Sequence, residues 1–241
     1  HLPAVHARHH PVEDDGVVLV LGGVPKPVDA VMGYVVRTTF GLKPAARVVL
    51  SDSRAATLSC VFAAAETATA AGEHLEHALR RIRDEAREAV TAGASILILS
   101  DREAGPDQIP IPALLAVSAV HHDLIRQGLR MRCGLVVETG EAREIAHFAL
   151  LIGYGAAAIN PYVAFETIDQ LVEEGTFVPP TLDLESAHAH YRKAIGKGLL
   201  KIFAKMGIST LRSYRGAQIF EAIGIARPVI DENFTGTRSR I

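Results

Sequence analysis

The middle of the chain alternates between amphipathic and uniformly apolar segments. From Glu73 to Val90, apolar side chains recur every three or four residues, and charged side chains fill the positions between them. This spacing predicts an amphipathic helix with one apolar stripe, which Gly93 ends. Residues 95–99 then form a run that is apolar after its first residue. Such a run predicts a strand buried on both faces, as in a parallel sheet covered by helices.

The same alternation continues as far as Gly175. The pattern predicts further helices at 113–127, 142–152 and 163–174, and strands at 17–21, 47–50, 133–137 and 157–159. Strands and helices that alternate with short connections favour right-handed crossovers and a mostly parallel sheet. The predicted fold class is therefore α/β, with a mostly parallel sheet and flanking helices.

A connector at 176–183, which carries Pro179-Pro180, interrupts this order and marks a candidate domain boundary. Beyond it the pattern predicts a long helix at 184–206, a short strand at 208–210 and a helix at 214–223, with a loose polar tail after Pro228. The organisation that we expect is a lead-in at 1–50, an α/β domain at 51–183 and a second unit at 184–241.

Composition restricts the possible functions. Hydrophobic residues make up 49% and charged residues 22% of the 241, which is typical of a soluble globular protein. The net charge of -2 gives no basis for nucleic-acid binding or for an acidic lipid surface. The two cysteines, Cys60 and Cys133, lie in apolar stretches and match no zinc or iron–sulfur spacing. We expect inert thiols in a reducing cytoplasm, with no membrane segment and no secretory leader.

Residues 153–158, Gly-Tyr-Gly-Ala-Ala-Ala, match the letters of a dinucleotide-binding fingerprint. That fingerprint works when a strand precedes it and a helix follows it, so that the helix N-terminus meets the pyrophosphate. Here the predicted order is helix and then strand. A tight turn between the two is the better interpretation.

The histidines raise the question of a metal site. His121-His122 and His188/His190 have spacings that do not share a helix face, whereas His74 and His77 could share one. A zinc site at that last pair would need a third ligand, and no pattern points to one. We therefore predict no metal ligands.

Acidic residues follow two of the predicted strands. Asp101-Arg102 comes after the first, and Glu138, Glu141 and Glu144 come after the next. One interpretation is a polar rim on a ligand crevice, since open α/β sheets bind ligands at the carboxyl ends of their strands. The favoured one is structural: Asp101 caps a turn, and Glu141 and Glu144 stabilise the N-terminus of the following helix. No catalytic residue can be assigned.

Longer segments go further than spacing, because they resemble the glutamate synthase large subunit, from its central domain into the start of its FMN-binding domain. The segments that carry this resemblance are SILILSDR (95–102), IPALLAVSAVHH (111–122), GLVVETGEARE (134–144), HFALLIGYGA (147–156), AINPY (158–162), KAIGKGLLK (193–201), KMGIST (205–210), SYRGAQIFEAIG (213–224) and FTGTRSRI (234–241). They follow one another in order from about residue 74 to the end. No segment of residues 1–50 is assigned to this resemblance.

The resemblance implies a chemistry for the parent enzyme. Such enzymes pass ammonia from a glutamine amidotransferase domain to a second site, where 2-oxoglutarate is aminated and reduced through FMN to give glutamate. Electrons arrive through an iron–sulfur cluster from NADPH, NADH or ferredoxin, in some cases through a small electron-donating subunit. The central domain joins the reactive domains and is expected to have no cofactor of its own.

The same resemblance implies that this chain is a fragment and not an active enzyme alone. It lacks the amidotransferase cysteine, the cluster cysteines, most of a (β/α)₈ barrel and the C-terminal domain. Residues 184–241 would supply the first β/α unit of that barrel, with Met206, Gly207, Ser209 and Thr210 beside the FMN. The alternative hypothesis is an independent α/β module that binds a small ligand at Asp101 and Glu138.

Overall fold

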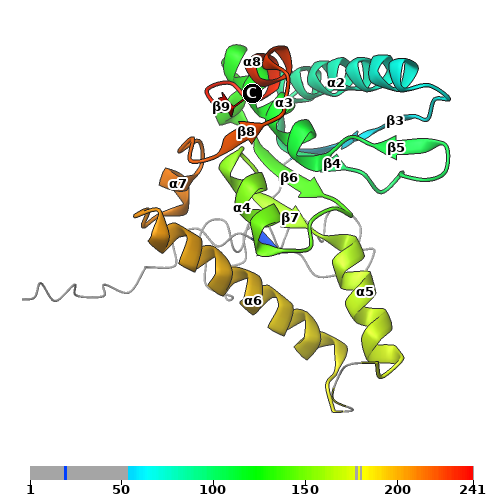
Figure 1. Ribbon diagram of the computed structural model, residues 1–241, viewed down its shortest axis with the longest axis vertical. Helices are drawn as coiled ribbons and strands as arrows, with labels where there is room; N and C mark the ends of the chain where they lie inside the picture. The colour runs from blue at the N-terminus through cyan, green and yellow to red at the C-terminus, as the bar shows by residue number, and fades with distance from the viewer. Residues whose placement is uncertain (1–18, 21–53, 177–178, 180, 241) are drawn as a thin grey trace, which may run out of the picture.

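A parallel five-stranded sheet organises the protein (Figure 1). The computed structural model describes residues 19–20, 54–176, 179 and 181–240, so the strand expected at 47–50 and most of the 1–50 lead-in lie outside the described residues. The sheet has the order β1-β7-β6-β4-β2, with every neighbouring pair parallel. Its strands are β1 (Leu19–Val20), β2 (Arg54–Ser59), β4 (Ala94–Ser100), β6 (Gly134–Glu138) and β7 (Ala158–Asn160).

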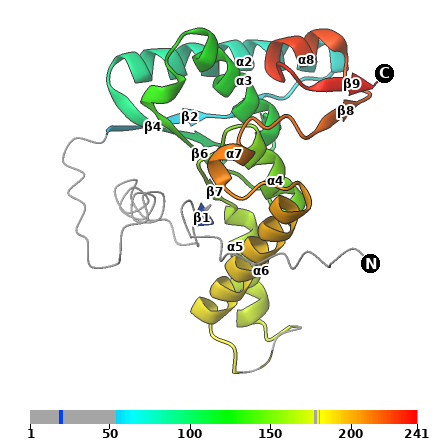
Figure 2. The same ribbon diagram turned by 90° about the vertical axis from the view of Figure 1, so that its left-hand side faces the viewer.

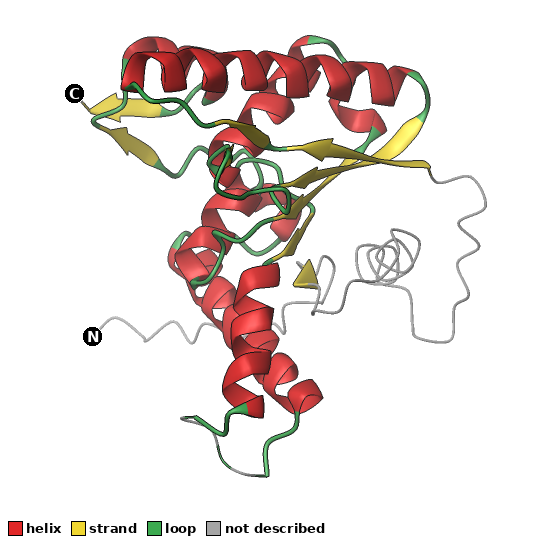
Figure 3. Cartoon of the chain, turned by 90° about the vertical axis from the view of Figure 1, so that its right-hand side faces the viewer, coloured by secondary structure: helices red, strands yellow, loops and turns green. Residues whose placement is uncertain are grey.

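Three helices connect successive strands of this sheet. They are α2 (Ala68–Thr91), α3 (Ala113–Arg126) and α4 (Ile145–Gly153). Each connection moves one strand further in the same direction, from β2 to β4 to β6 to β7, so right-handed crossovers place all three helices on one face (Figure 3). The predicted α/β class with a mostly parallel sheet and flanking helices is confirmed.

Strand β4 lies at the centre of the core. Leu97 and Leu99 join the main hydrophobic cluster together with Ile82 of α2, and Ile96 and Ile98, which alternate with the two leucines, are buried as well. The strand is therefore buried on both faces, as its unbroken apolar run predicts. Each such aliphatic side chain contributes about 1.5–3 kcal/mol when it is fully buried.

Two further parts extend from the sheet. A short antiparallel pair, β3 (Val61–Ala63) with β5 (Gln108–Pro110), lies beyond the ends of β2 and β4. Helices α5 (Tyr162–Glu173) and α6 (Leu184–Lys205) pack against each other and extend together away from α2 and α3 (Figure 2). A single 3₁₀ turn at Arg130–Arg132 leads into β6.

The last part of the chain differs from the prediction. It contains α7 (Leu211–Tyr214), β8 (Glu221–Ile223), α8 (Arg227–Asn233) and β9 (Arg238–Arg240), and β8 pairs with β9 in parallel. The expected strand at 208–210, the expected helix at 214–223 and the expected loose tail after Pro228 were therefore wrong. In their place stands a small β–α–β unit.

The backbone explains each of these differences. The Ile208 amide donates to Phe203 O at the end of α6, and Thr210 is the N-cap of α7, so this segment is used by two helix termini. Gly216 and Gln218 have positive φ angles of 70° and 53°, which interrupt any helix there. Pro228 stands in the first turn of α8, where its missing amide hydrogen costs nothing.

Helix α8 is fastened to α2 and α3. Arg83 of α2 donates to Glu232 at 2.6 Å and to the Asn233 side chain, and the Ser118 hydroxyl of α3 donates to the Asn233 carbonyl. Arg126 adds a hydrogen bond to the Glu232 carbonyl at 3.2 Å. We call this set the α8 latch. It joins α8, near the end of the described residues, to two helices that precede it by about 100 to 150 positions.

Among the described residues, no helix combines the length and the apolar composition that a membrane crossing requires.

Candidate functional site

The carboxyl edge of the sheet carries the polar residues that the sequence singles out. Asp101, directly after β4, is buried, and its carboxylate accepts from the Thr139 hydroxyl at 2.5 Å and from the Gly140 amide at 3.0 Å. Thr139 and Gly140 directly follow β6. Asp101 therefore links the ends of two neighbouring strands, because its carboxylate accepts from a donor on the far side.

Arg102 and Glu138 form the next layer of this edge. The Arg102 Nε donates to Glu138 Oε1 at 2.7 Å, and its guanidinium also reaches Glu166 of α5 at 3.3 Å. The Ser100 hydroxyl donates to the other Glu138 oxygen at 2.6 Å, and Asn160 Nδ2 donates to Glu138 Oε1 at 3.2 Å. Side chains from the two strands on either side of β6, together with Arg102, thus donate to a single carboxylate, and Glu166 of α5 joins them through Arg102.

The Arg102 guanidinium also lies over the ring of Tyr162, 4.1 Å from its centroid. Burial lowers the pKa of Arg102, but its hydrogen bonds and ion pairs with Glu138 and Glu166 outweigh that effect and raise the pKa overall. Burial, the charge of Asp101 and a hydrogen bond to Asp101 raise the pKa of Tyr162. Both groups keep their ordinary protonation states at neutral pH, so neither Arg102 nor Tyr162 is poised to exchange a proton near pH 7.

The two remaining glutamates serve different helices. Glu144 is the N-cap of α4, as its position in the sequence predicts. Glu141 does not act on α4: its carboxylate accepts from the Ala113 amide, the first of α3, at 2.8 Å. Pro112 precedes α3 and supplies no side-chain cap, so Glu141 takes that role from a distant loop. The structural interpretation of these acids is supported, with two corrections: Glu141 caps α3, and the Asp101 side chain binds the residues after β6 and does not cap a turn of its own.

The histidines are distributed over separate places. His188 contacts Asp169 at 2.5 Å, His74 contacts the Ala63 carbonyl at 3.0 Å, and His190 is exposed. His121 and His122 lie beside each other with ring centroids 5.1 Å apart. Within the described ranges, no three metal-ligating side chains come together in a group that could hold a metal ion.

The cysteines are both buried and free. Burial raises the pKa of Cys60 to about 12, with a further contribution from the charge of Asp101. Burial also raises the pKa of Cys133. Neither thiol ionises at neutral pH, which makes both poor nucleophiles.

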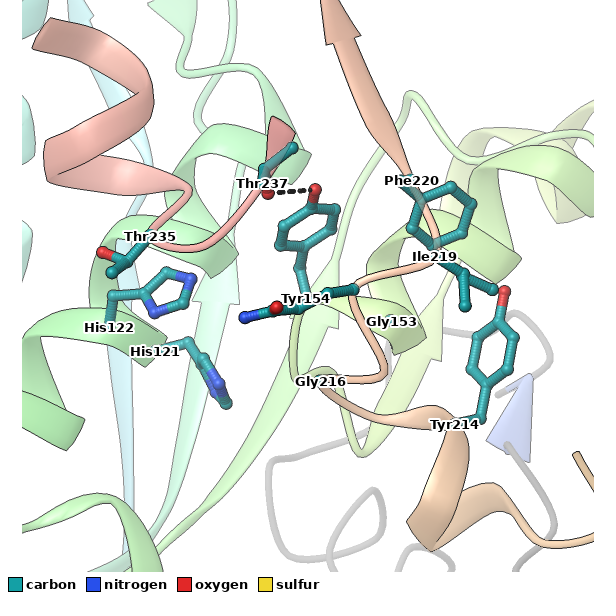
Figure 4. Close-up of a pocket in the computed structure, with 11 residues that line it drawn as sticks. His121, His122, Gly153, Tyr154, Tyr214, Gly216, Ile219, Phe220, Thr235 and Thr237 are labelled. Carbon is teal, nitrogen blue, oxygen red and sulfur yellow. Dashed lines mark hydrogen bonds between the residues drawn. The ribbon is translucent and has the colours of Figure 1, made fainter. Parts of the chain in front are cut away.

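Residues 153–155 form the turn between α4 and β7, so the order is helix and then strand, and the fingerprint interpretation was rightly rejected. The glycines serve packing. A Cβ on Gly153 would lie 2.7 Å from the Phe220 ring, and a Cβ on Gly155 would lie 2.3 Å from His121 Nδ1. Gly155 also has a φ of 113°, which other residues rarely adopt. Gly153 and Gly155 therefore leave room for the rings of Phe220 and His121 to pack directly against the backbone (Figure 4).

Met206, Gly207, Ser209 and Thr210, the residues expected beside FMN, lie together in the turn from α6 to α7, and all four are exposed. Gly207 has a φ of 68°, and the space where its Cβ would stand is open. Thr210 Oγ1 caps α7 through the Ser213 amide at 3.2 Å. The turn is open to the close approach of a flat group, but it presents one surface and encloses nothing.

The fold and its polar edge define a parallel α/β domain whose charged edge groups are paired with one another. A family model described as glutamate synthase central domain matches residues 42–226. The chain belongs to this glutamate synthase family.

Three relatives show how the chain compares with whole proteins. The glutamate synthase [NADPH] large chain of Bacillus subtilis is 52% identical over 169 residues, which cover 70% of this chain and 11% of that protein. The glutamate synthase [NADH] of Schizosaccharomyces pombe is 46% identical, and the match covers 68% of this chain and 8% of that protein. The ferredoxin-dependent glutamate synthase 2 of Synechocystis is 47% identical, and the match covers 69% of this chain and 11% of that protein. The chain spans about a tenth of the length of these curated relatives.

Among solved structures, a mutant flavocytochrome b2 with benzoylformate matches with a TM-score of 0.47 at 10% identity, over 56% of this chain and 31% of that one.

Proposed function

We propose that this chain is the connecting part of a glutamate synthase large subunit, which holds an amidotransferase domain and an FMN barrel in a fixed relation. The parent reaction would make glutamate from 2-oxoglutarate and glutamine-derived ammonia. The chain's share of it is structural, and no catalytic residue is assigned to it. Three observations support this proposal: the family match, the small share of each relative that is covered, and the paired charges of the polar edge.

The α8 latch is the observation that carries the proposal. Arg83 and Ser118 belong to the helices that cover the sheet, whereas Glu232 and Asn233 belong to the segment that resembles the start of the FMN barrel. The Gly216 amide adds a contact to the Gly153 carbonyl at 2.9 Å. A segment held by two buried hydrogen bonds and by further contacts at its surface moves with the sheet. This is the property that a connector between two reactive sites needs.

The turn of Met206, Gly207, Ser209 and Thr210 would face the flavin in this proposal. Gly207 allows backbone to approach the ring closely, and Ser209 offers an exposed hydroxyl. Bound FMN would supply the hydride chemistry, and these residues would only position one edge of it. Since they form one open surface, we expect the isolated chain to bind FMN weakly or not at all and to form no glutamate. The iron–sulfur cluster would lie in other parts of the parent.

Relatives named for NADPH, NADH and ferredoxin match this chain at 52%, 46% and 47% identity. Such even similarity is expected if the residues that select the electron donor lie in other domains or in a separate small subunit. The chain therefore does not distinguish the three donors.

The test loosens the latch within an intact large subunit that contains this sequence. Arg83→Gln should lower glutamine-dependent glutamate formation more than it lowers ammonia-dependent formation or glutaminase activity, because each site stays whole while their relation is lost. Arg80→Gln is the matched control, since Arg80 lies on the same helix in an exposed pair with Glu76. Equal losses in all three activities, or no loss in any, would contradict the connecting role.

The alternative, an independent module with a ligand at Asp101 and Glu138, gains no support from this edge. The donors that a ligand would use there, from Thr139, Gly140 and Arg102, already bind Asp101 and Glu138.

A further inference from the structure

Helix α6 and the turn that follows it concentrate positive charge. Residues 184–215 contain seven lysines and arginines and a single acid, Glu185, which gives this segment a net charge of +6. The whole chain has a net charge of -2, so the remaining residues carry a net charge of -8. A strongly basic surface on an otherwise acidic chain favours contact with a partner of negative charge.

Four lysines form a row on the outside of this helix, and we call them the lysine row. Lys193, Lys197, Lys201 and Lys205 follow one another at steps of four, and all four are exposed. No other lysine occurs in the described part of the chain. Residues four apart lie on the same side of a helix, so the row extends over about 18 Å. Figure 1 shows α6, in gold, along the outer edge of the molecule.

The lysine row has no matching acids on its own helix. Asp183 and Glu185 stand at the start of α6, and none of the four lysines makes an ion pair with a carboxylate of the described residues. Like charges four residues apart destabilise a helix. The helix dipole favours Lys205 in the last turn, but Lys193 and Lys197 lie in the middle of the helix and gain nothing from it.

Helix α2 shows how a helix face in contact with water is charged in this protein. Its surface arginines pair with acids three or four residues away, as Arg80 does with Glu76 and Arg87 with Asp84. Alternating signs of this kind are typical of a solvated helix face. The lysine row lacks them, so solvation alone does not explain its composition.

An apolar side chain accompanies the charges. Leu200 is 51% exposed, and it stands three residues after Lys197 and four before the exposed Ala204, so the three share one side of α6. An apolar centre with a charged rim is typical of a protein–protein contact. A nucleic acid is a poorer fit, because α6 has no exposed aromatic residue on which a base could stack.

We propose that the lysine row docks onto an acidic protein surface that another domain of the parent large subunit supplies, with Leu200 against an apolar part of that surface. Carboxylates there would give the lysines the partners that α6 lacks, and complementary charges would fix the orientation of the two surfaces. The match covers only 11% of a relative such as the Bacillus subtilis large chain, so most surfaces that could meet α6 belong to other domains. This contact rests on the proposed connecting function and names one place where it would act.

The test compares lysine reactivity in the 241-residue chain and in an intact large subunit that contains it. Acetylation by sulfosuccinimidyl acetate, read by mass spectrometry, should be about tenfold slower or more at Lys193, Lys197 and Lys201 in the large subunit, because a covered amine reacts only when the contact opens. Arg80→Lys places a reference lysine on α2, which should react equally fast in both. A carbodiimide, which joins an amine to a carboxylate in direct contact, should link the row to aspartate or glutamate of another domain.

Charge reversal tests the chemistry of the partner. In the large subunit, Lys197→Glu should raise the acetylation rates of Lys193 and Lys201 towards those of the 241-residue chain, whereas Arg80→Glu should leave them low. Rates that stay low in Lys197→Glu would show a cover that is indifferent to charge, and would overturn the acidic partner.

Three other results would also overturn the contact. They are equal acetylation rates of the row in the chain and in the large subunit, equal slowing of the reference lysine, and carbodiimide links only to a second copy of this chain. The activities of Arg83→Gln are measured separately. An open lysine row together with lost coupling in Arg83→Gln would therefore overturn this contact and leave the connecting function standing.

Discussion

Two regions of this protein differ in how their charged side chains are paired. At the carboxyl edge of the sheet, Asp101, Arg102 and Glu138 have their charges or their donors matched by neighbouring side chains. Beside the glycine turn at 153–155, Arg130 contacts only neutral acceptors, and Arg215 Nε has no hydrogen-bond partner among the described residues. The first region satisfies its charged groups internally, although the buried Asn160 Oδ1 has no partner among the described residues. The second keeps two arginines close together without a carboxylate partner among the described residues.

This difference shows why position alone is a weak guide to function. Open α/β sheets bind ligands beyond the carboxyl ends of their strands, which favours the first region as a ligand site. The count of satisfied polar atoms favours the second. A buried group that already has its partners gains little from a ligand, whereas an unpartnered one gains a full hydrogen bond. The predictions below test this contrast in order of decreasing effect.

The largest effect is expected from Asp101→Ala. This change leaves the Thr139 hydroxyl and the Gly140 amide without their acceptor in a buried place, which should lower the free energy of unfolding by about 3 kcal/mol. Urea denaturation measures the loss, with Asp107→Ala as the control, because Asp107 is exposed on a nearby loop. Equal stabilities of the two variants would contradict the view that the edge is a structural network.

The second largest effect is expected from Gly155→Ala, which should disturb the packing of the His121 ring against the glycine turn. Its new Cβ would stand 2.3 Å from His121 Nδ1, and its φ of 113° is unfavourable for alanine, so we expect a loss of about 2–3 kcal/mol. Gly93→Ala is the matched control, because its φ of 98° is similar and the space around it is open. The backbone term alone should cost about 1 kcal/mol there. If the two variants lose the same amount in thermal denaturation, His121 does not rest on Gly155.

The pH dependence of stability should report on His121. Its pKa is about 3 when folded against an ordinary 6.5, so the unfolded chain takes up a proton first as the pH falls. Stability is therefore full above pH 6.5 and falls as the pH drops through 6.5 towards 3. Between pH 7 and pH 5.5 the loss should be roughly 1 kcal/mol.

His121→Gln should flatten much of this slope in urea denaturation at the two pH values. His122, whose pKa burial also lowers, would keep part of it. The exposed His190, changed to Gln, is the control that should leave the slope as it is. An unchanged slope in His121→Gln would show that His121 is not held neutral.

The smallest effect is expected at the outer layer of the polar edge. Glu166→Gln removes one partner of Arg102, but that carboxylate is 59% exposed and Arg102 keeps Glu138. The loss should be under about 0.5 kcal/mol, as for most exposed ion pairs. Glu138→Gln, which disturbs the inner carboxylate, should cost clearly more. A larger loss of stability in Glu166→Gln than in Glu138→Gln would show that the network depends on its exposed pair more than on its inner carboxylate.

The regular part of the fold could be predicted from the sequence because its signals are periodic. The helix around Leu79 and Ile82 and the strand at Leu97 and Leu99 follow patterns that packing then satisfies. Strand β2 was missed because Arg54–Ser59 carries alanine, threonine and serine at an edge of the sheet, with no apolar run. Strands β3 and β5 are too short to give a pattern.

The tail was mispredicted because its signals are single residues. An apolar Ile208 beside Ser209 and Thr210 suggests a strand, but these residues complete one helix and begin the next. Pro228 suggests a break, although it begins α8. The boundaries at residues 50 and 183 stay predictions, and so does the FMN role of the turn at Met206.

The polar sites, like the fold, could be predicted only where a regular element determines the contact. Asp101 and Glu138 could be found at strand ends, because a sheet brings those ends together. The pairing of Glu141 with the first amide of α3 could not, because a loop far along the chain makes that contact. Arg130 and Arg215 come from a 3₁₀ turn and from the segment after α7. Only the folded chain places them beside one histidine.

The α8 latch has a consequence for the order in which the protein folds. Arg83 and Asn233 are separated by 150 positions, so their contact closes one of the longest loops in the chain. During synthesis the sheet and its helices emerge from the ribosome well before α8 does. Until α8 has emerged, Arg83 cannot form its hydrogen bonds to Glu232 and Asn233. Closing such a loop is slow compared with forming local contacts. The latch therefore closes late among the contacts of the described residues, and it cannot close before α8 has been made.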